Sequence, residues 1–157
     1  MFRTVRELVE IAEKENLLIS EVMIRQEMDI KNKTREEVFN EMERNLQVME
    51  KAVADSLKGV HSVTGLTGGD AVKIQDYMKK HTPLSGYVML DAVSKAMGTN
   101  EVNAAMGVIC ATPTAGSAGV VPGTLFAVKE QLNPTREQMI RYLFTAGAFG
   151  LVVANNA

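Results

Sequence analysis

Hydrophobic residues in the first 58 positions recur at helical spacing and predict three amphipathic helices. The first would be capped by Thr4, with Glu7 three residues later completing a capping box, and would run to about residue 16. The second, over about residues 21–33, would be capped by Ser20. The third would follow Thr34, again with a glutamate three residues later, and end near residue 58.

Beyond residue 58 the pattern is less regular but still helical. Asp70 is expected to cap one helix, Gly98 to end the next, and Thr135 or Asn133 to cap a last helix. That last helix is apolar on nearly every side after Tyr142, which predicts a central position. The expected helices cover about residues 70–80, 84–97, 101–106, 122–132 and 136–154. No strand-like alternation exceeds four residues, so the predicted class is all-α, a multi-helix domain with buried glycine- and proline-rich loops.

Composition changes sharply near residue 59. Residues 1–58 carry 23 charged side chains and neither glycine nor proline, whereas residues 59–157 hold all the glycines and prolines and only 13 charges. We therefore expect residues 1–58 to form a charged, exposed helical layer and residues 59–157 to form an apolar helical part. A front part that moves as a separate helical subdomain is the alternative.

The most unusual stretch runs from Asn103 to Gly123, inside a run with no charged residue from Val102 to Val128. Its apolar character predicts burial, whereas its glycines, prolines and hydroxyls predict an irregular loop. A buried loop is costly because its backbone groups need partners, so such loops often bind something. The amides of residues 114–117 could form an anion-binding nest, and Pro122 suits the first turn of a following helix. A structural turn of small residues explains the same pattern equally well.

A second polar loop, residues 60–70, contains Thr67 and Gly68 just before a predicted helix. A functional interpretation would place it beside the same site, whereas an ordinary capped loop is the simpler interpretation. It contains no phosphate-binding motif, because the lysine at the required offset and the GxGxxG spacing are both missing.

The run Cys-Ala-Thr-Pro-Thr-Ala-Gly-Ser-Ala-Gly-Val-Val-Pro-Gly, residues 110–123, resembles the signature loop of the iron–sulfur-dependent L-serine dehydratases, alpha subunit. The segments 64–70, 99–107 and 150–157 also resemble that family. The resemblance covers nearly the whole chain but only the front part of the family's alpha subunit. It implies that the cluster-binding cysteines follow the segment 150–157, so we expect a fragment that ends before them and is inactive alone.

The resemblance further implies a complete enzyme that converts L-serine to pyruvate and ammonia with a 4Fe-4S cluster and without pyridoxal phosphate. It implies a beta subunit as partner and an oligomeric assembly. On this resemblance, we expect the substrate to be bound by Thr112, Thr114, Ala115, Gly116 and Ser117, supported by Asn103, with Thr67 and Gly68 from the second loop. We assign no catalytic base. We expect no metal ligand here, because a cluster needs at least three cysteines and the chain has one, Cys110.

Charge and composition exclude several function classes. A net charge of −2, a pI near 5.7 and the absence of tryptophan argue against a nucleic-acid partner. The prolines and glycines of the uncharged run argue against a membrane span, and no signal peptide is apparent. One cysteine excludes a disulfide framework, so we expect a cytoplasmic protein. The alternative function is a non-catalytic helical interaction domain with a small-anion-binding loop.

Overall fold

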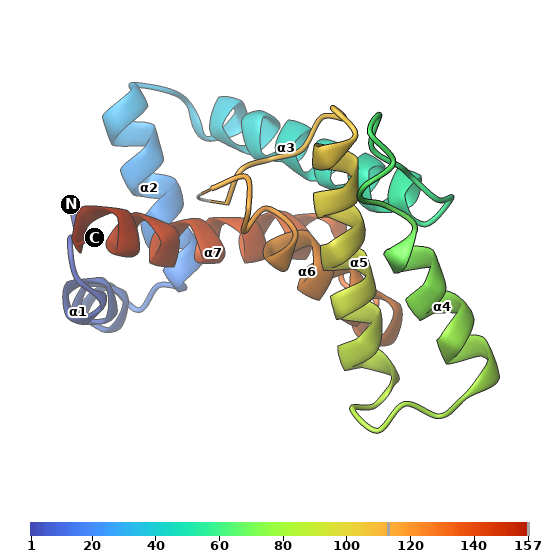
Figure 1. Ribbon diagram of the computed structural model, residues 1–157. Coiled ribbons are helices and arrows are strands. Elements are labelled where there is room, and N and C mark those ends of the chain that lie inside the picture. The colour runs from blue at the N-terminus through green and yellow to red at the C-terminus, as the bar shows by residue number, and fades with distance from the viewer. Residues whose placement is uncertain (113, 157) are drawn as a thin grey trace. The chain divides into compact units, whose positions relative to one another are not determined.

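The computed structural model describes residues 1–112 and 114–156 of the chain and shows an all-α protein, as expected (Figure 1). Within these residues no strand forms, and a single isolated bridge pairs His61 with Gly68. No helix in this part of the chain is long and apolar enough to cross a membrane. The helices are α1 Val5–Glu15, α2 Ile19–Lys31, α3 Arg35–Ser56, α4 Asp70–Lys80, α5 Tyr87–Ala104, α6 Val120–Leu132 and α7 Arg136–Asn156.

The chain forms two compact units that do not follow the compositional boundary. Met1–Leu46 and Thr135–Ala157 make up one unit, and Gln47–Pro134 make up the other. The expected layers, residues 1–58 and 59–157, therefore remain a prediction drawn from charge. The last helix, α7, belongs to the same compact unit as residues 1–46.

The first unit is built on the packing of α2 against α7. Leu8, Ile24 and Phe144 are almost fully buried in its core, and the rings of Phe39 and Phe144 lie 5.6 Å apart. The capping box of α1 is confirmed, because the Thr4 hydroxyl accepts from the Glu7 amide and the Glu7 carboxylate accepts from the Thr4 amide. The same reciprocal bonds join Thr34 and Glu37 at the start of α3.

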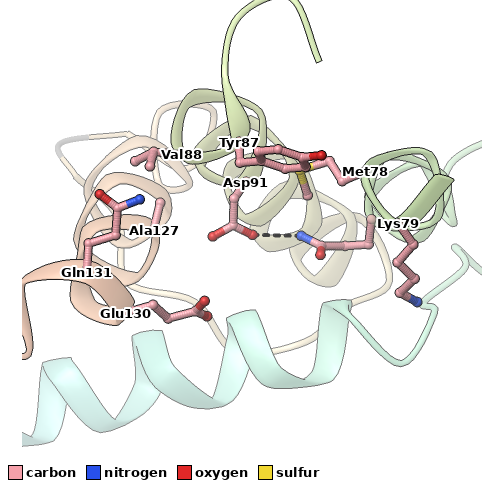
Figure 2. Close-up of a pocket in the computed structure, with 9 residues that line it drawn as sticks. Met78, Lys79, Tyr87, Val88, Asp91, Ala127, Glu130 and Gln131 are labelled. Carbon is pink, nitrogen blue, oxygen red and sulfur yellow. Dashed lines mark hydrogen bonds between the residues drawn. The ribbon is translucent and has the colours of Figure 1, made fainter. Parts of the chain in front are cut away.

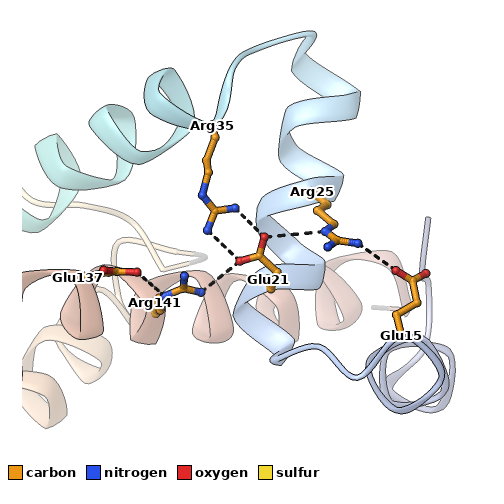
Figure 3. Close-up of polar contacts among 6 residues, drawn as sticks. All are labelled: Glu15, Glu21, Arg25, Arg35, Glu137 and Arg141. Atoms are coloured by element: carbon orange, nitrogen blue, oxygen red, sulfur yellow. Dashed lines mark hydrogen bonds and ion pairs between the residues drawn. The ribbon is translucent and has the colours of Figure 1, made fainter.

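A network of ion pairs centred on Glu21 links three helices of this unit (Figure 3). The Arg35 guanidinium donates to both oxygens of the Glu21 carboxylate, at 2.6 and 2.9 Å, and Arg141 of α7 donates at 3.2 Å. Arg25, one turn along α2, lies 3.8 Å from the same carboxylate. The hydrogen bonds from Arg35, with those from Arg141, lower the pKa of Glu21 from 4.5 to about 2.

Two expectations about this unit are wrong. Ser20 does not cap α2: it is buried within the helix, which starts at Ile19, two residues earlier than expected, and has no side-chain cap. Serine is favoured at N-caps, but here it lies in the first turn of the helix, and the neighbouring Glu21 belongs to the ion-pair network. The end of α7 is also less central than expected, since Phe149 and Val153 are 41% and 60% exposed.

In the second unit, α5 packs against both α4 and α6. The sequence predicted that Gly98 ends a helix, and this prediction is wrong. Gly98 lies buried inside a continuous α5. A Cβ at Gly98 would lie 2.2 Å from the Ser56 hydroxyl oxygen and 3.1 Å from the Ala71 Cβ. Glycine is needed there because neighbouring segments approach the helix closely, and this requirement is invisible in the local sequence.

The contact between α5 and α6 also depends on missing side chains. A Cβ at Gly119 would lie 2.1 Å from the carbonyl oxygen of Ala96, and one at Gly123 would lie 2.7 Å from that of Ala92. Both glycines are buried at the start of α6. Part of the glycine content of the central stretch is thus explained by close helix packing.

Candidate functional site

The central stretch was expected to be buried, but its described residues before Ala118 are exposed or half-buried. Met106 and Val108 are 87% and 74% exposed, and the segment 114–116 is exposed as well. Burial begins only at Ala118, where the chain enters α6. An absence of charge does not require burial: at the surface, water can satisfy the backbone groups of an irregular loop.

Three of the predicted binding residues meet in this loop, although Pro113 between them lies outside the described residues. The hydroxyl oxygens of Thr114 and Ser117 are 3.0 Å apart. The Ser117 hydroxyl donates to the Thr112 carbonyl at 2.8 Å, and the Thr112 hydroxyl donates to the Ser117 carbonyl at 3.1 Å. The loop therefore closes on itself through its own hydroxyl groups.

The bonds between Thr114 and Ser117 follow the capping-box pattern. The Ser117 amide donates to the Thr114 hydroxyl, and the Thr114 amide donates to the Ser117 hydroxyl, both at 3.3 Å. Two of the four amides predicted to bind an anion are thus occupied. The other two, of Ala115 and Gly116, donate no hydrogen bond to any described residue. They lie in a turn that precedes α6, whose N-cap is Gly119.

The second predicted loop is shaped mainly by backbone constraints. The Ser62 amide donates to the Thr67 carbonyl at 2.8 Å, and Gly68 has a φ of 124°. A Cβ at Gly68 would lie 2.1 Å from the Val60 carbonyl oxygen. Gly69, with a φ of 83°, is the N-cap of α4 in place of the expected Asp70. No hydrogen bond among the described residues joins Thr67 or Gly68 to the loop of residues 112–117.

A residue that the sequence prediction did not select connects the segments that bear these loops. Glu101, in the last turn of α5, is only 7% exposed. One of its carboxylate oxygens accepts from the Asp70 amide at 2.7 Å and from the Ala71 amide at 3.3 Å. Asn103, a predicted binding residue, lies half-buried two positions further along α5. The available signal was that Glu101 is the last charged residue before the uncharged run.

Comparison with known sequences decides the family. The family profile described as "Serine dehydratase alpha chain" matches residues 14–157. This chain belongs to the serine dehydratase alpha chain family. It is 70% identical over all 157 residues to a Bacillus subtilis protein named "Probable L-serine dehydratase, alpha chain", and covers 52% of that relative.

More distant family members match over the same extent. The "L-serine dehydratase, alpha chain" of Peptoniphilus asaccharolyticus is 28% identical over 159 aligned residues, which take in all of this chain and 54% of the relative. The chain thus spans about half the length of these two relatives. No solved structure matches the chain.

The residues of this serine dehydratase alpha chain segment do not fit an iron–sulfur cluster. Cluster ligation needs several thiolates, and Cys110 is the single cysteine. Among the described residues, no group of three or more His, Cys, Asp or Glu side chains could hold a metal ion. Cys110 is half-buried, and this burial raises the pKa of its thiol, which disfavours the thiolate that a metal would need.

A cavity of about 260 Å³ between α4, α5 and α6 was also not predicted (Figure 2). The Gln75 amide donates to the Asp91 carboxylate at 2.8 Å on its wall. Behind it, the buried Lys95 ammonium donates to Asp91, to the Phe126 carbonyl at 2.9 Å and to Glu130 at 3.3 Å. These groups satisfy one another, so the network is explained as a link between the three helices. The i,i+4 spacing of Asp91 and Lys95 was its signal in the sequence.

Proposed function

We propose that this chain is the amino-terminal part of the alpha chain of an L-serine dehydratase, whose complete form converts L-serine to pyruvate and ammonia. The observation that carries the proposal is membership of the serine dehydratase alpha chain family, with 70% identity to the Bacillus subtilis relative over the full chain. Because the chain spans about half of that relative, the activity is proposed for the complete enzyme.

The proposed reaction is the elimination of water from the amino acid. A proton leaves Cα, the Cβ–O bond breaks, and the hydroxyl group leaves with its electron pair, which gives aminoacrylate and water. Aminoacrylate tautomerises to an imine, which one water molecule hydrolyses to pyruvate and ammonia. Elimination needs the hydroxyl and the α-hydrogen held in a fixed relative orientation, so the carboxylate must be anchored.

We assign that anchoring to the exposed loop. The amides of Ala115 and Gly116 have no described partner, and the hydroxyls of Thr114 and Ser117 frame them. Thr112 supports this turn through its bonds to Ser117. Asn103 of α5 and Thr67 and Gly68 of the loop before α4 remain part of the proposed site as predictions from the sequence. We assign no catalytic base to this chain.

The cofactor and partners of the complete enzyme are also proposals. The 4Fe-4S cluster implied by the family resemblance would have to be held by residues outside this chain, because one cysteine cannot ligate it. The name "alpha chain" of the relatives supports a beta chain as partner. We propose that the complete enzyme is a cytoplasmic oligomer that does not use pyridoxal phosphate.

Product formation tests this function directly. The full-length alpha chain and the beta chain would be reconstituted without oxygen in the presence of iron and sulfide, and then supplied with L-serine. We expect pyruvate and ammonia in equal amounts, with none from either chain alone. A fully assembled, cluster-loaded enzyme that forms no pyruvate from L-serine would contradict the proposal.

A further inference from the structure

We propose that Glu101 is a positioning residue for substrate binding, which fixes the loop before α4 and the loop after α5 to a common anchor. The inference rests on the proposed function, because it gives these two loops their role. It starts from the Glu101 side chain, which joins the last turn of α5 to the first turn of α4.

The start of α4 depends on Glu101 for its hydrogen bonds. Gly69, the N-cap, has no side chain, so it leaves the first amides of the helix without a local cap. The Glu101 carboxylate accepts from two of these amides, including that of the fully buried Ala71. A negative charge at this end of a helix is also favoured by the helix dipole.

The other loop leaves α5 directly beside this anchor. The Gly107 amide donates to the Val102 carbonyl at 2.8 Å, and Met106 has a φ of 64°. A Cβ at Gly107 would lie 2.5 Å from a Val102 side-chain carbon. The direction in which the chain departs toward residues 112–117 is therefore set one residue after Glu101. The Glu101 carboxylate thus ties the start of α4 to the residue next to this point of departure.

The second carboxylate oxygen of Glu101 argues against a purely stabilising role. It is buried and has no hydrogen-bond partner among the described residues. An unpaired buried oxygen on a carboxylate is destabilising, and such groups are rare in native proteins. Because this unpaired oxygen destabilises the fold, a role of Glu101 in positioning the two loops explains its presence better than a role in stabilising α4 does.

A positioning role predicts a specific kinetic effect. If the loops grip the substrate's carboxylate equally in the ground state and the transition state, then loosening them raises KM and changes kcat little. A purely structural cap predicts lower thermal stability with unchanged KM in the enzyme that remains folded.

The test compares Glu101→Ala, Glu101→Gln and Glu101→Asp in the complete enzyme. We expect Glu101→Ala to raise the KM for L-serine about 10-fold or more, with kcat within about threefold of wild type, as loss of uniform binding requires. Glutamine keeps the length and one acceptor oxygen, so it should restore KM to within about threefold, since the bonds to two amides are retained. Aspartate, which is one methylene shorter, should not restore KM.

Glu21→Ala is the matched control: it removes a multiply bonded carboxylate from the other unit and should leave KM unchanged.

Hydrogen exchange gives a second readout that needs no activity. In Glu101→Ala, exchange should accelerate at the Asp70 and Ala71 amides and at the hydrogen-bonded amides of residues 105–107, whereas Glu21→Ala should leave these amides protected. Wild-type KM in all three Glu101 variants, or an equal rise in Glu21→Ala, would overturn the inference. If Glu101→Ala does not fold, an aspartate variant with wild-type KM would overturn it. If the wild-type enzyme makes no pyruvate, the proposed function fails separately, and unchanged exchange would then overturn the positioning role.

Discussion

At the scale of single residues, the Glu21 carboxylate makes a pH-dependent contribution to stability. Its pKa is lowered from 4.5 to about 2 in the folded state, chiefly by hydrogen bonds from Arg35. The folded state therefore favours the ionised form. This contribution is complete above the unfolded pKa of 4.5 and is lost as the pH falls from 4.5 through about 2.

We predict that Glu21→Gln lowers the free energy of unfolding by about 2 kcal/mol at pH 7, allowing for partial solvent exposure of the pair. The difference from wild type should shrink as the pH falls below 4.5. Urea unfolding at several pH values measures it. Glu10→Gln, at an exposed position of α1, serves as the control and should change little at any pH. A Glu21 difference that is constant from pH 7 to 3 would contradict the assignment.

Residue-scale prediction succeeded where the partner is near in sequence. The bonds of Thr4 with Glu7 and of Thr34 with Glu37 span three residues and were predicted. The bond from Asp70 to Glu101 spans 31 residues and was not. A local pattern reports local partners, so a helix cap supplied from another helix leaves no signature around the helix it caps.

At the scale of elements, two glycine-to-alanine substitutions should change the free energy of unfolding in opposite directions. One lies at the contact of α5 with α6, and the other lies in α7, away from that contact. Gly123→Ala would place a Cβ 2.7 Å from the Ala92 carbonyl and 2.8 Å from the Ala96 Cβ, so the helices must shift. We expect destabilisation by about 2 kcal/mol, a typical cost of overpacking. Gly147→Ala, in α7, meets nothing within 4 Å and should stabilise by about 0.5–1 kcal/mol through helix propensity.

Thermal or denaturant unfolding of the two variants checks this pair. Stabilisation by both substitutions would mean that α5 and α6 are not in close contact.

The same argument explains the error at Gly98, where a helix end was predicted. Glycine at a helix end and glycine at a close helix contact look identical in one sequence, and only the neighbouring Ser56 and Ala71 distinguish them.

At the scale of the whole molecule, the helical class and the family were accessible from the sequence, because periodicity and a specific motif carry them. The exposed or half-buried position of residues 105–112 and 114–117 was not, since apolar, uncharged residues were taken to mean burial. The loop instead exposes Met106 and Val108. The sequence still selected Thr112, Thr114 and Ser117, which the fold brings together in one turn.

The central claim is that this turn holds the carboxylate of L-serine, and the KM of Thr114→Val in the complete enzyme tests it most directly. The substitution removes the hydroxyl that accepts from the Ser117 amide. Thr124→Val is the matched control, because the Thr124 hydroxyl donates to carbonyls of its own helix. We predict a KM for L-serine raised about 10-fold or more by Thr114→Val and changed less than about twofold by Thr124→Val. A wild-type KM in folded Thr114→Val enzyme would contradict the account.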